Sequence, residues 1–360
     1  MKDQYNRTID YIRISLTDQC NLNCCYCMPE GTNKCSMQSS LMQNEEILHL
    51  AALFRKAGIK KVKLTGGEPL LRRNIPELIW GLKEQCGMES VTITTNGVLL
   101  SGMLPKLVSA GLDGVNISID SLDPVRYAKI TGSACLPEVL EGVHTALSQD
   151  QLNVKLNCVP LENRADILAL AALARDTRLL VRFIELMPIG EGKRLSGMRV
   201  NEILAFLEAE YGPAKCCSKP LGSDPEEVSG KLSGSDPEEA SGKLSGSGSV
   251  KHCMESFGNG PAVYYDFPDF HGKIGFINAV SHSFCASCSR IRLTADGRIK
   301  GCLQYEAGAN LKQALRDGVP DEALLAQITD AIYHKPKEHC FFQEAEHTHM
   351  ETHPMSEIGG

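Results

Sequence analysis

The sequence of 360 residues lacks any stretch of about 18 consecutive apolar residues, the length that a membrane-spanning helix requires. Its N-terminus, MKDQYNRTIDYIRIS, has no apolar core of the kind that secretory signals carry, so we expect a cytoplasmic protein. Basic residues are not in excess, because 37 Lys and Arg are outnumbered by 44 Asp and Glu, for a net charge of −7. This balance argues against nucleic acid as a partner, although a local basic pocket for a small anion is compatible with it.

Cysteine, by contrast, is abundant. Fifteen cysteines occur in a chain without an export signal, and disulfide frameworks belong to small secreted proteins. Metal ligation therefore explains them better than disulfide bonding. Two groups stand out in the sequence, which we call the first trio (Cys20, Cys24 and Cys27) and the second trio (Cys285, Cys288 and Cys302).

Short β-rich runs alternate with helix-period runs over the first 210 residues. Strands are expected at 10–16, 61–65, 90–94, 114–119, 153–158 and 180–185, and helices at 44–57, 74–86, 103–110, 136–149 and 163–176. Six such units predict a parallel sheet with right-handed crossovers. Because a closed barrel needs eight units, we expect an α/β fold with a partial (β/α)6 TIM-like barrel, or an open α/β sheet, with its site at the carboxyl ends of the strands.

Residues 219–249 differ in composition from the rest. SDPEEVSGKLSG is followed directly by SDPEEASGKLSG, a polar tandem repeat. Two polar copies cannot build a core, so we predict a flexible insertion, with an acidic docking segment as the alternative. The insertion would separate a barrel domain, 1–215, from a smaller C-terminal α+β domain, 250–360. Strands at 263–267 and 273–280 and a helical stretch at 309–334 are expected in that second domain.

The first trio follows the first expected strand directly. Three thiolates can hold one face of a 4Fe–4S cluster, and because a fully protein-held cluster needs four, one iron would stay open. Zinc is the alternative, since Cys25 or Cys35 could complete a closed four-ligand site.

Two motifs together resemble the radical S-adenosylmethionine (SAM) superfamily. These are Cys-x3-Cys-x2-Cys, with Tyr26 before the third cysteine, and Gly66-Gly67-Glu68-Pro69 after the second expected strand. The resemblance implies that SAM chelates the open iron, that the GGEP backbone binds the SAM amine, and that the reduced cluster yields a 5′-deoxyadenosyl radical.

The second trio is again one ligand short, and two incomplete sites are hard to explain as structural zinc. Its segment resembles the GTP 3′,8-cyclase family of molybdenum-cofactor biosynthesis, as do several others in order along nearly the whole chain. The matching segments are YIRISLTDQCNLNCCYCMPEG, KLTGGEPLLRR, TTNG, NISIDSLD, VKLN, RFIELMPIGEG, FCASCSRIRLTADGRIKGCL and the final Gly359-Gly360.

This resemblance implies a lyase with two 4Fe–4S clusters, one on each trio, and GTP between them. No lone side chain would be the catalyst, because the radical takes hydrogen from the 3′ carbon of the ribose and the ribose radical attacks carbon 8 of guanine. The product would be (8S)-3′,8-cyclo-7,8-dihydroguanosine 5′-triphosphate. The implied SAM contacts are Tyr26, Gly67, Ser118 and Met187, and the implied GTP contacts are Arg13, Lys63, Thr94, Lys155, Arg290, Ile291 and Arg292.

The implied partners are a low-potential electron donor and the downstream cyclic pyranopterin monophosphate synthase, with a homodimer left open. Arg13 and Lys155 lie in strand patterns, where each could form either a structural ion pair or part of a phosphate-binding site. Because several cations are predicted at one end of one barrel, the phosphate-binding site is the favoured interpretation. Lys63 replaces the usual Arg of the family, and Cys25 is an extra thiol.

Three other functions stay open: a different two-cluster radical SAM enzyme that modifies a peptide or tetrapyrrole, an inactive relative, and a non-enzymatic protein stapled by zinc.

Overall fold

The computed structural model describes residues 1–28, 41–217, 257, 260–281, 284–339, 341, 351 and 355–358. In this part of the chain, one curved sheet of eleven strands has the order β11-β10-β1-β2-β3-β4-β5-β6-β9-β8-β7. Its central strands are parallel: β1 (Tyr11–Ser15), β2 (Lys61–Thr65), β3 (Ser90–Thr95), β4 (Gly114–Ser118), β5 (Asn153–Cys158) and β6 (Leu180–Ile184).

The strands that follow residue 257 extend the same sheet at both ends. The strand β9 (Lys273–Ile277) pairs in parallel with β6, and β10 (Arg290–Leu293) pairs in parallel with β1. Three short strands pair antiparallel at the margins: β7 (Lys215–Cys216), β8 (Val263–Asp266) and β11 (Ile299–Lys300). The residues after β9 therefore bring the second trio back beside β1, close in space to the first trio.

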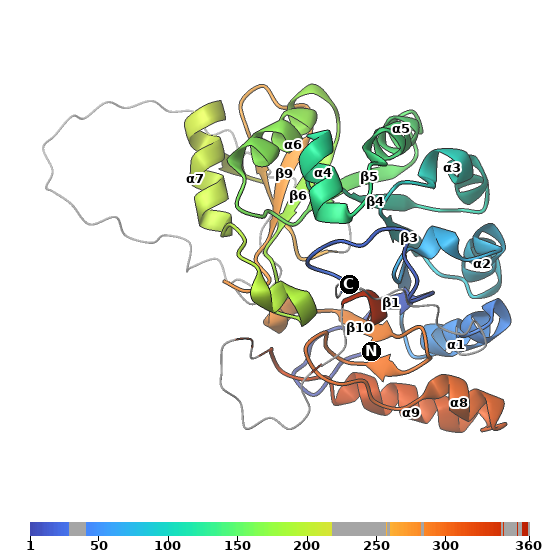
Figure 1. Cartoon of the computed structure of the whole chain (residues 1–360). Helices are drawn as coiled ribbons and strands as arrows, with labels where there is room; N and C mark the ends of the chain where they lie inside the picture. The colour runs from blue at the N-terminus through green and yellow to red at the C-terminus, as the bar shows by residue number, and fades with distance from the viewer. Residues whose placement is uncertain are drawn as a thin grey trace, which may run out of the picture.

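Helices cover the outer face of the sheet (Figure 1). They are α1 (Asn44–Lys56), α2 (Ile75–Trp80, continued by a π turn at Gly81–Gln85), α3 (Leu100–Ser109), α4 (Pro124–Thr131), α5 (Leu136–Leu147), α6 (Arg164–Asp176), α7 (Val200–Tyr211), α8 (Leu311–Arg316) and α9 (Asp321–Tyr333). The short helix α10 (Met355–Ile358) lies instead on the inner side of the sheet, where Met355 lines a cavity. None of these helices is long and apolar enough to cross a membrane.

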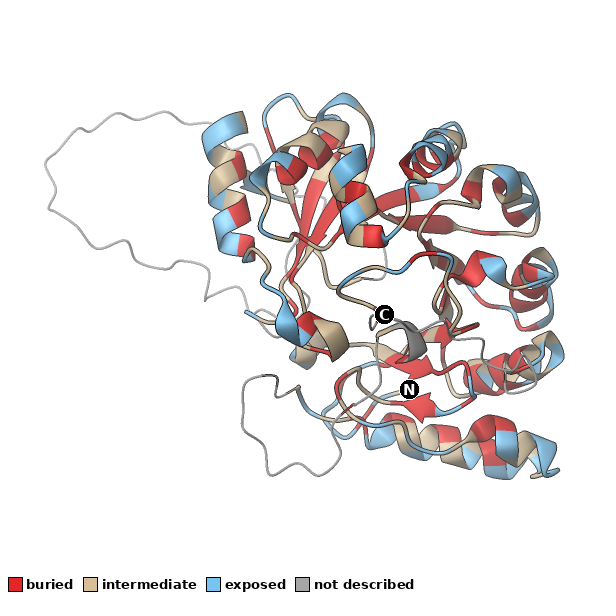
Figure 2. Cartoon of the chain, viewed as in Figure 1, coloured by how far each residue is buried: buried red, intermediate tan, exposed pale blue. Residues whose placement is uncertain are grey.

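The helix α1 illustrates how the covering layer forms. Gln43 and Glu46 make a capping box at its start, and acidic residues in the first turn and basic ones in the last complement the helix dipole. Ile47, Leu50 and Phe54 recur at helical spacing and are fully buried. Figure 2 shows the same pattern around the molecule, with buried residues on the strands and on the helix faces turned toward them.

Strict alternation along the strands separates the core from the interior of the barrel. Even-numbered residues of β1 and β2, such as Ile12, Val62 and Leu64, are buried in the hydrophobic core between sheet and helices. Odd-numbered residues such as Arg13 and Lys63 point to the other face and line a cavity. In a parallel sheet that is packed on both faces, the strands have nearly continuous apolar sequences. The alternation seen here therefore indicates that the inner face of the barrel is polar.

The predicted fold class is confirmed, because the structure is an α/β protein with a partial barrel of parallel strands. All six predicted barrel strands are present, with ends that differ by one residue or less. The helix α4 is an addition: the Asp123 carboxylate caps it and Pro124 occupies its first turn, a start signal that the period of apolar residues did not reveal. The predicted insertion, 219–249, lies outside the described residues.

Candidate active site

A cavity of about 490 Å³ lies inside the curved sheet, and both cysteine trios line it. All six cysteines come from loops or turns beside β1, β10 and β11, although more than 250 residues of sequence separate the first trio from the second. Cys25 is exposed and is not one of the lining residues. The trios thus share one cavity, which is the arrangement that the sequence interpretation required.

Two contacts hold the loop of the first trio, one with the end of α4 and one with the buried carboxylate of Asp120. Backbone N–H groups of Asn23 and Cys25 donate to carbonyls at the end of α4. The Tyr26 hydroxyl donates to Asp120 Oδ2 at 2.7 Å, and Asp120 Oδ1 accepts from the Val159 N–H. Burial raises the pKa of Asp120 to about 6, and burial with neighbouring cysteine and Asp120 raises the pKa of Cys27 to about 12.

The GGEP turn packs directly against this loop. The Gly67 N–H donates to the Thr17 carbonyl and the Glu68 N–H donates to the Gln19 carbonyl, both at 2.7 Å. Gly66 has a φ of +145°, which other residues rarely adopt, and a Cβ on Gly67 would lie 2.1 Å from the Gln19 oxygen. Only glycines allow the two loops to approach this closely.

Glu68 holds the far side of that turn. Its carboxylate accepts hydrogen bonds from the Thr95 hydroxyl and from the backbone N–H groups of Leu70 and Asn96. Burial outweighs these bonds and raises the pKa of Glu68 to about 7. The carboxylate thereby ties the end of β2 to the end of β3, beneath the first trio.

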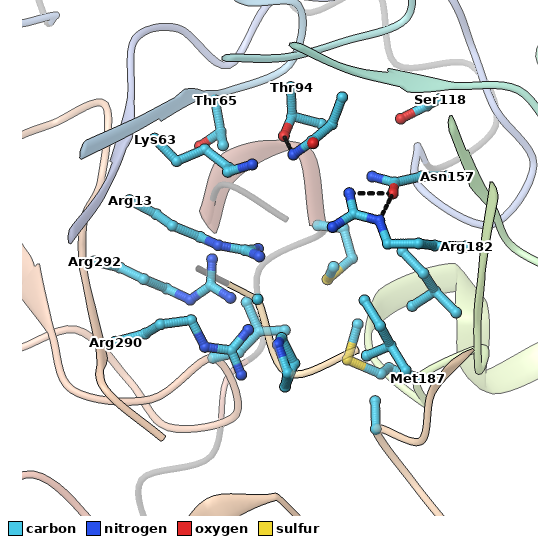
Figure 3. A pocket seen from close by; sticks show the side chains of 18 of the residues that line it. Arg13, Lys63, Thr65, Thr94, Ser118, Asn157, Arg182, Met187, Arg290 and Arg292 are labelled. Atoms are coloured by element: carbon cyan, nitrogen blue, oxygen red, sulfur yellow. Dashed lines mark hydrogen bonds between the residues drawn. The ribbon is translucent and has the colours of Figure 1, made fainter. Parts of the chain in front are cut away.

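Cations crowd the opposite part of the cavity. Arg13 pairs in register with Lys63 on β2 and with Arg292 on β10, so three inward cations lie side by side. Figure 3 shows them pointing into the same space together with Arg290, with Arg182 facing them across it. Burial first, and then repulsion by the other cations, lowers the pKa of Lys63 and of Arg292.

A bound anion would reduce the repulsion among these buried cations. Buried like charges are costly unless a partner neutralises them. Arg13 Nε is buried and has no hydrogen-bond partner among the described residues, so a donor is available in the wall of the cavity. The geometry and charge of this group therefore fit the phosphates of a nucleotide.

Arg182 and Asn157 belong to this site, and the sequence interpretation missed both. Arg182 Nε and Nη2 donate to Asn157 Oδ1 at 2.9 and 2.5 Å, and the two residues are register partners on β6 and β5. Arg182 is 6% exposed. The strand LVRFI carried the signal that Arg182 points into the cavity. Its neighbours Val181 and Phe183 are core residues, so the side chain between them lies on the opposite face of the strand.

The second trio begins just before β10. Burial alone would raise the pKa of Cys288, but Arg290 and Lys335 outweigh it and lower the pKa to about 6, which favours the thiolate. Cys302 follows Gly301, whose carbonyl accepts from Lys335 Nζ at 2.6 Å. Cationic groups thus surround these thiols, in contrast to the acidic surroundings of the first trio.

The predicted contacts fall into two sets. Ten of the predicted SAM and GTP residues line the cavity, namely Tyr26, Gly67, Ser118, Met187, Arg13, Lys63, Thr94, Lys155, Arg290 and Arg292. Ile291 does not, because β10 alternates and its side chain is buried in the hydrophobic core. Any contact of Ile291 with a ligand is therefore limited to its backbone, and the role of every residue in both sets stays a prediction.

The donor set fits two iron–sulfur clusters. Each trio offers three thiols to the shared cavity, and thiolates are the ligands that such clusters use.

Two family models match this chain. Residues 14–174 match the Radical SAM superfamily model, and residues 239–341 match the Molybdenum Cofactor Synthesis C model. Among solved structures, Streptococcus suis SuiB has a TM-score of 0.55 at 12% identity, covering 92% of this chain and 68% of that one, and it supports the fold alone.

Curated relatives match over the full length. The GTP 3′,8-cyclase of Clostridium perfringens (strain 13 / Type A) is 40% identical over 362 residues, covering 100% of both chains. The GTP 3′,8-cyclase of Desulforamulus reducens is 36% identical over 365 residues, again with 100% of both chains covered. Identity of this extent shows that the chain belongs to the GTP 3′,8-cyclase family.

Proposed function

We propose that the protein is a radical SAM lyase that converts GTP to (8S)-3′,8-cyclo-7,8-dihydroguanosine 5′-triphosphate, the first step of molybdenum-cofactor biosynthesis. The observation that carries the proposal is the shared cavity, which both trios and a group of buried cations line. Full-length identity to GTP 3′,8-cyclases supports the same assignment.

In this proposal the cations bind the triphosphate. A triphosphate carries about four negative charges, and Arg and Lys are the side chains that meet phosphate. Arg13, Lys63 and Arg292 would contact it from adjacent strands, and Arg182 from the opposite wall. The position of Lys63 beside two arginines preserves the charge, although a lysine lacks the bidentate geometry of the usual arginine.

The first trio and the GGEP turn would hold the SAM cluster and SAM. When bound, this cluster supplies the electron that cleaves SAM to a 5′-deoxyadenosyl radical. The chain's part is to hold the SAM methionine end against the GGEP turn and the remainder near Tyr26, Ser118 and Met187, which all line the cavity. Fixing the donor beside one C–H bond of the ribose provides the regioselectivity.

The second trio would hold a second 4Fe–4S cluster at the base end of GTP. Arg290 and Lys335 lie beside these thiols, which suits an anionic cluster and its ligands. Met355 of the C-terminal helix α10 lines the same cavity. The final Gly359-Gly360, which we predict to reach into the site, lies outside the described residues.

The test is an anaerobic incubation of the reconstituted protein with SAM, GTP and dithionite, which replaces the low-potential donor. We expect 5′-deoxyadenosine and the cyclised nucleotide in equal amounts. Adding the cyclic pyranopterin monophosphate synthase should then consume the nucleotide. Absence of both products from protein that carries iron and sulfide would overturn the proposal.

Lys155 should make GTP binding depend on pH. Burial, and then Arg182, lowers the pKa of Lys155 to about 7 in the free protein. A phosphate beside it raises that pKa, so binding takes up a proton when the pH lies above about 7, and affinity falls by up to about tenfold per pH unit until the pKa of the complex is reached. Below pH 7 the lysine is already charged and this effect disappears.

Calorimetric titration with GTP from about pH 6 to 9 measures this linkage, because both the affinity and the protons taken up are obtained from buffers of different ionisation enthalpy. The matched control is Lys155→Arg, which stays charged throughout. Ionisation of the nucleotide affects both proteins equally. Equal pH slopes for the wild type and the arginine variant would contradict the role of Lys155.

We propose that residues 219–249 form an insertion between a barrel domain, 1–215, and a C-terminal domain, 250–360. Deleting residues 221–248 should leave the rate of cyclisation within about twofold of the wild type, because long surface insertions alter chain-closure entropy little. Turnover and iron content are measured on the same preparation. Loss of activity with iron retained would favour the docking role instead.

A further inference from the structure

We propose that Arg7 is a positioning residue that sets the geometry of the second trio and, through it, the way GTP is held. The inference rests on the proposed function, and it concerns a residue of the N-terminal segment that precedes β1. Arg7 belongs to neither trio and is 7% exposed.

Arg7 uses all five of its guanidinium N–H donors. Nε donates to Asp3 Oδ2 at 2.6 Å, which also pairs the charge. Nη1 donates to the Cys285 carbonyl at 2.9 Å and to the Lys337 carbonyl at 2.7 Å, while Nη2 donates to the Pro336 and Lys335 carbonyls at 2.7 and 3.3 Å. A planar fork with five donors is available only from arginine.

These acceptors connect Arg7 to two of the three cysteines. The contact with Cys285 is direct, through its own carbonyl. The contact with Cys302 runs through Lys335, whose Nζ donates to the carbonyl of Gly301, the residue before Cys302. Arg7 and Lys335 also line the cavity. A change at Arg7 therefore reaches the second trio by two short routes.

Local structure explains why such a clamp is needed. The segment 335–337 follows α9 and lies outside any helix or strand. Cys285 lies in a short turn in which its carbonyl also accepts from the Cys288 N–H at 3.2 Å, so the bond from Arg7 is a second one there. Buried carbonyls without a regular ladder need donors from elsewhere. Asp3 holds the guanidinium in place, because its Oδ1 also accepts the backbone N–H groups of Tyr5 and Arg7.

The first trio lies outside this network. Its loop is held by Asp120, by the end of α4 and by the turn before Glu68, none of which contacts Arg7 in the bonds described above. Replacing the Arg7 guanidinium should consequently disturb the cluster on the second trio and leave the cluster on the first trio unchanged. That selectivity separates a positioning role from a general contribution to folding.

The experiment compares Arg7→Lys with the wild type, both full length and reconstituted anaerobically. Lysine keeps the charge beside Asp3 but offers three donors instead of five. We expect the SAM-dependent change in the electron paramagnetic resonance spectrum to persist and the GTP-dependent change to weaken. The ratio of 5′-deoxyadenosine to cyclised nucleotide should rise by about tenfold or more, which is the size expected for misplacement near the reacting centre.

Arg178→Lys is the matched control. Arg178 also donates to backbone carbonyls, those of Leu147 and Gln149, but it is exposed and is not one of the residues that line the cavity. Its spectra and product ratio should equal those of the wild type. A second variant, Asp3→Asn, retains an acceptor but removes the ion pair, and it should produce a smaller change of the same kind.

Three outcomes overturn the inference. One is an Arg7→Lys protein with the wild-type GTP response and product ratio, and another is loss of both clusters together, which would make Arg7 a general folding residue. The third is an Arg7→Lys protein that does not fold, paired with an Asp3→Asn protein that matches the wild type. A wild-type protein without any GTP-dependent response would instead mean failure of the proposed function, independently of Arg7.

Discussion

Replacing Cys302 by Ala is expected to abolish formation of the cyclised nucleotide, by a factor of about a thousand or more, while SAM cleavage continues. Cys302 lies in the loop after β11, and the contacts that hold the first trio come from Asp120, α4 and the GGEP turn. Loss of one thiol from the second trio should therefore leave the radical-generating end intact. Iron should fall from about eight to about four per chain, since each 4Fe–4S cluster contributes four.

The measurements are iron and sulfide content, 5′-deoxyadenosine and cyclised nucleotide from one anaerobic preparation. Cys25→Ala is the matched control, because Cys25 is exposed and absent from the cavity wall. It should keep about eight irons and wild-type turnover. If Cys25→Ala lost iron, Cys25 would be a ligand; if Cys302→Ala kept both iron and turnover, the second trio would not hold a cluster.

The cysteine trios and the inward cations of β1 and β2 could be predicted from the sequence because their signals are local. A fixed Cys spacing after a strand, and a GGEP turn after the next, are visible without knowing any long-range contact. Strand alternation places Arg13 and Lys63 on one face, and parallel pairing then brings them together. Spacing, periodicity and chain order indicate where these residues lie, and the resemblance to the family supplies the roles predicted for them.

Contacts between distant segments could not be predicted in this way. Arg7 precedes the first strand in a segment with no regular period, and its carbonyl partners are 278 to 330 residues away. The strand β10 was not predicted because its four residues lie between Cys288 and a turn, and pairing with β1 is what makes it a strand. In both cases tertiary contacts, rather than local propensity, determine the structure.

Ile291 shows the limit of carrying a motif over as a block. The segment Arg290-Ile291-Arg292 was predicted to contact GTP as a unit. In a strand, neighbouring side chains point to opposite faces, so Arg290 and Arg292 line the cavity while Ile291 packs in the core. A role for the segment as a whole must therefore be divided residue by residue.

Replacing Gly67 by Ala is expected to have the converse effect to Cys302→Ala. A Cβ at this position would lie 2.1 Å from the Gln19 carbonyl oxygen and 2.5 Å from its carbon, and backbone atoms cannot move aside as a flexible side chain can. The methyl group must push the loop that ends in Cys20 away from the GGEP turn. We expect loss of the first cluster and of SAM cleavage, by about a thousandfold or more, because both depend on that approach.

The control for this variant is Gly102→Ala in α3, where no atom lies within 4 Å of the added Cβ. Helical alanine is favoured over glycine by roughly 0.5–1 kcal/mol, so this protein should unfold at the same or a higher temperature and turn over normally. Gly67→Ala should keep the second cluster and about four irons. Full SAM cleavage by Gly67→Ala would mean that the two loops are not held together in solution as they are in the structure.

The two variants together separate the spectra of the clusters. Because Cys302→Ala should lose the second cluster and Gly67→Ala the first, the spectrum that remains in each variant belongs to one cluster and shows whether GTP or SAM perturbs it.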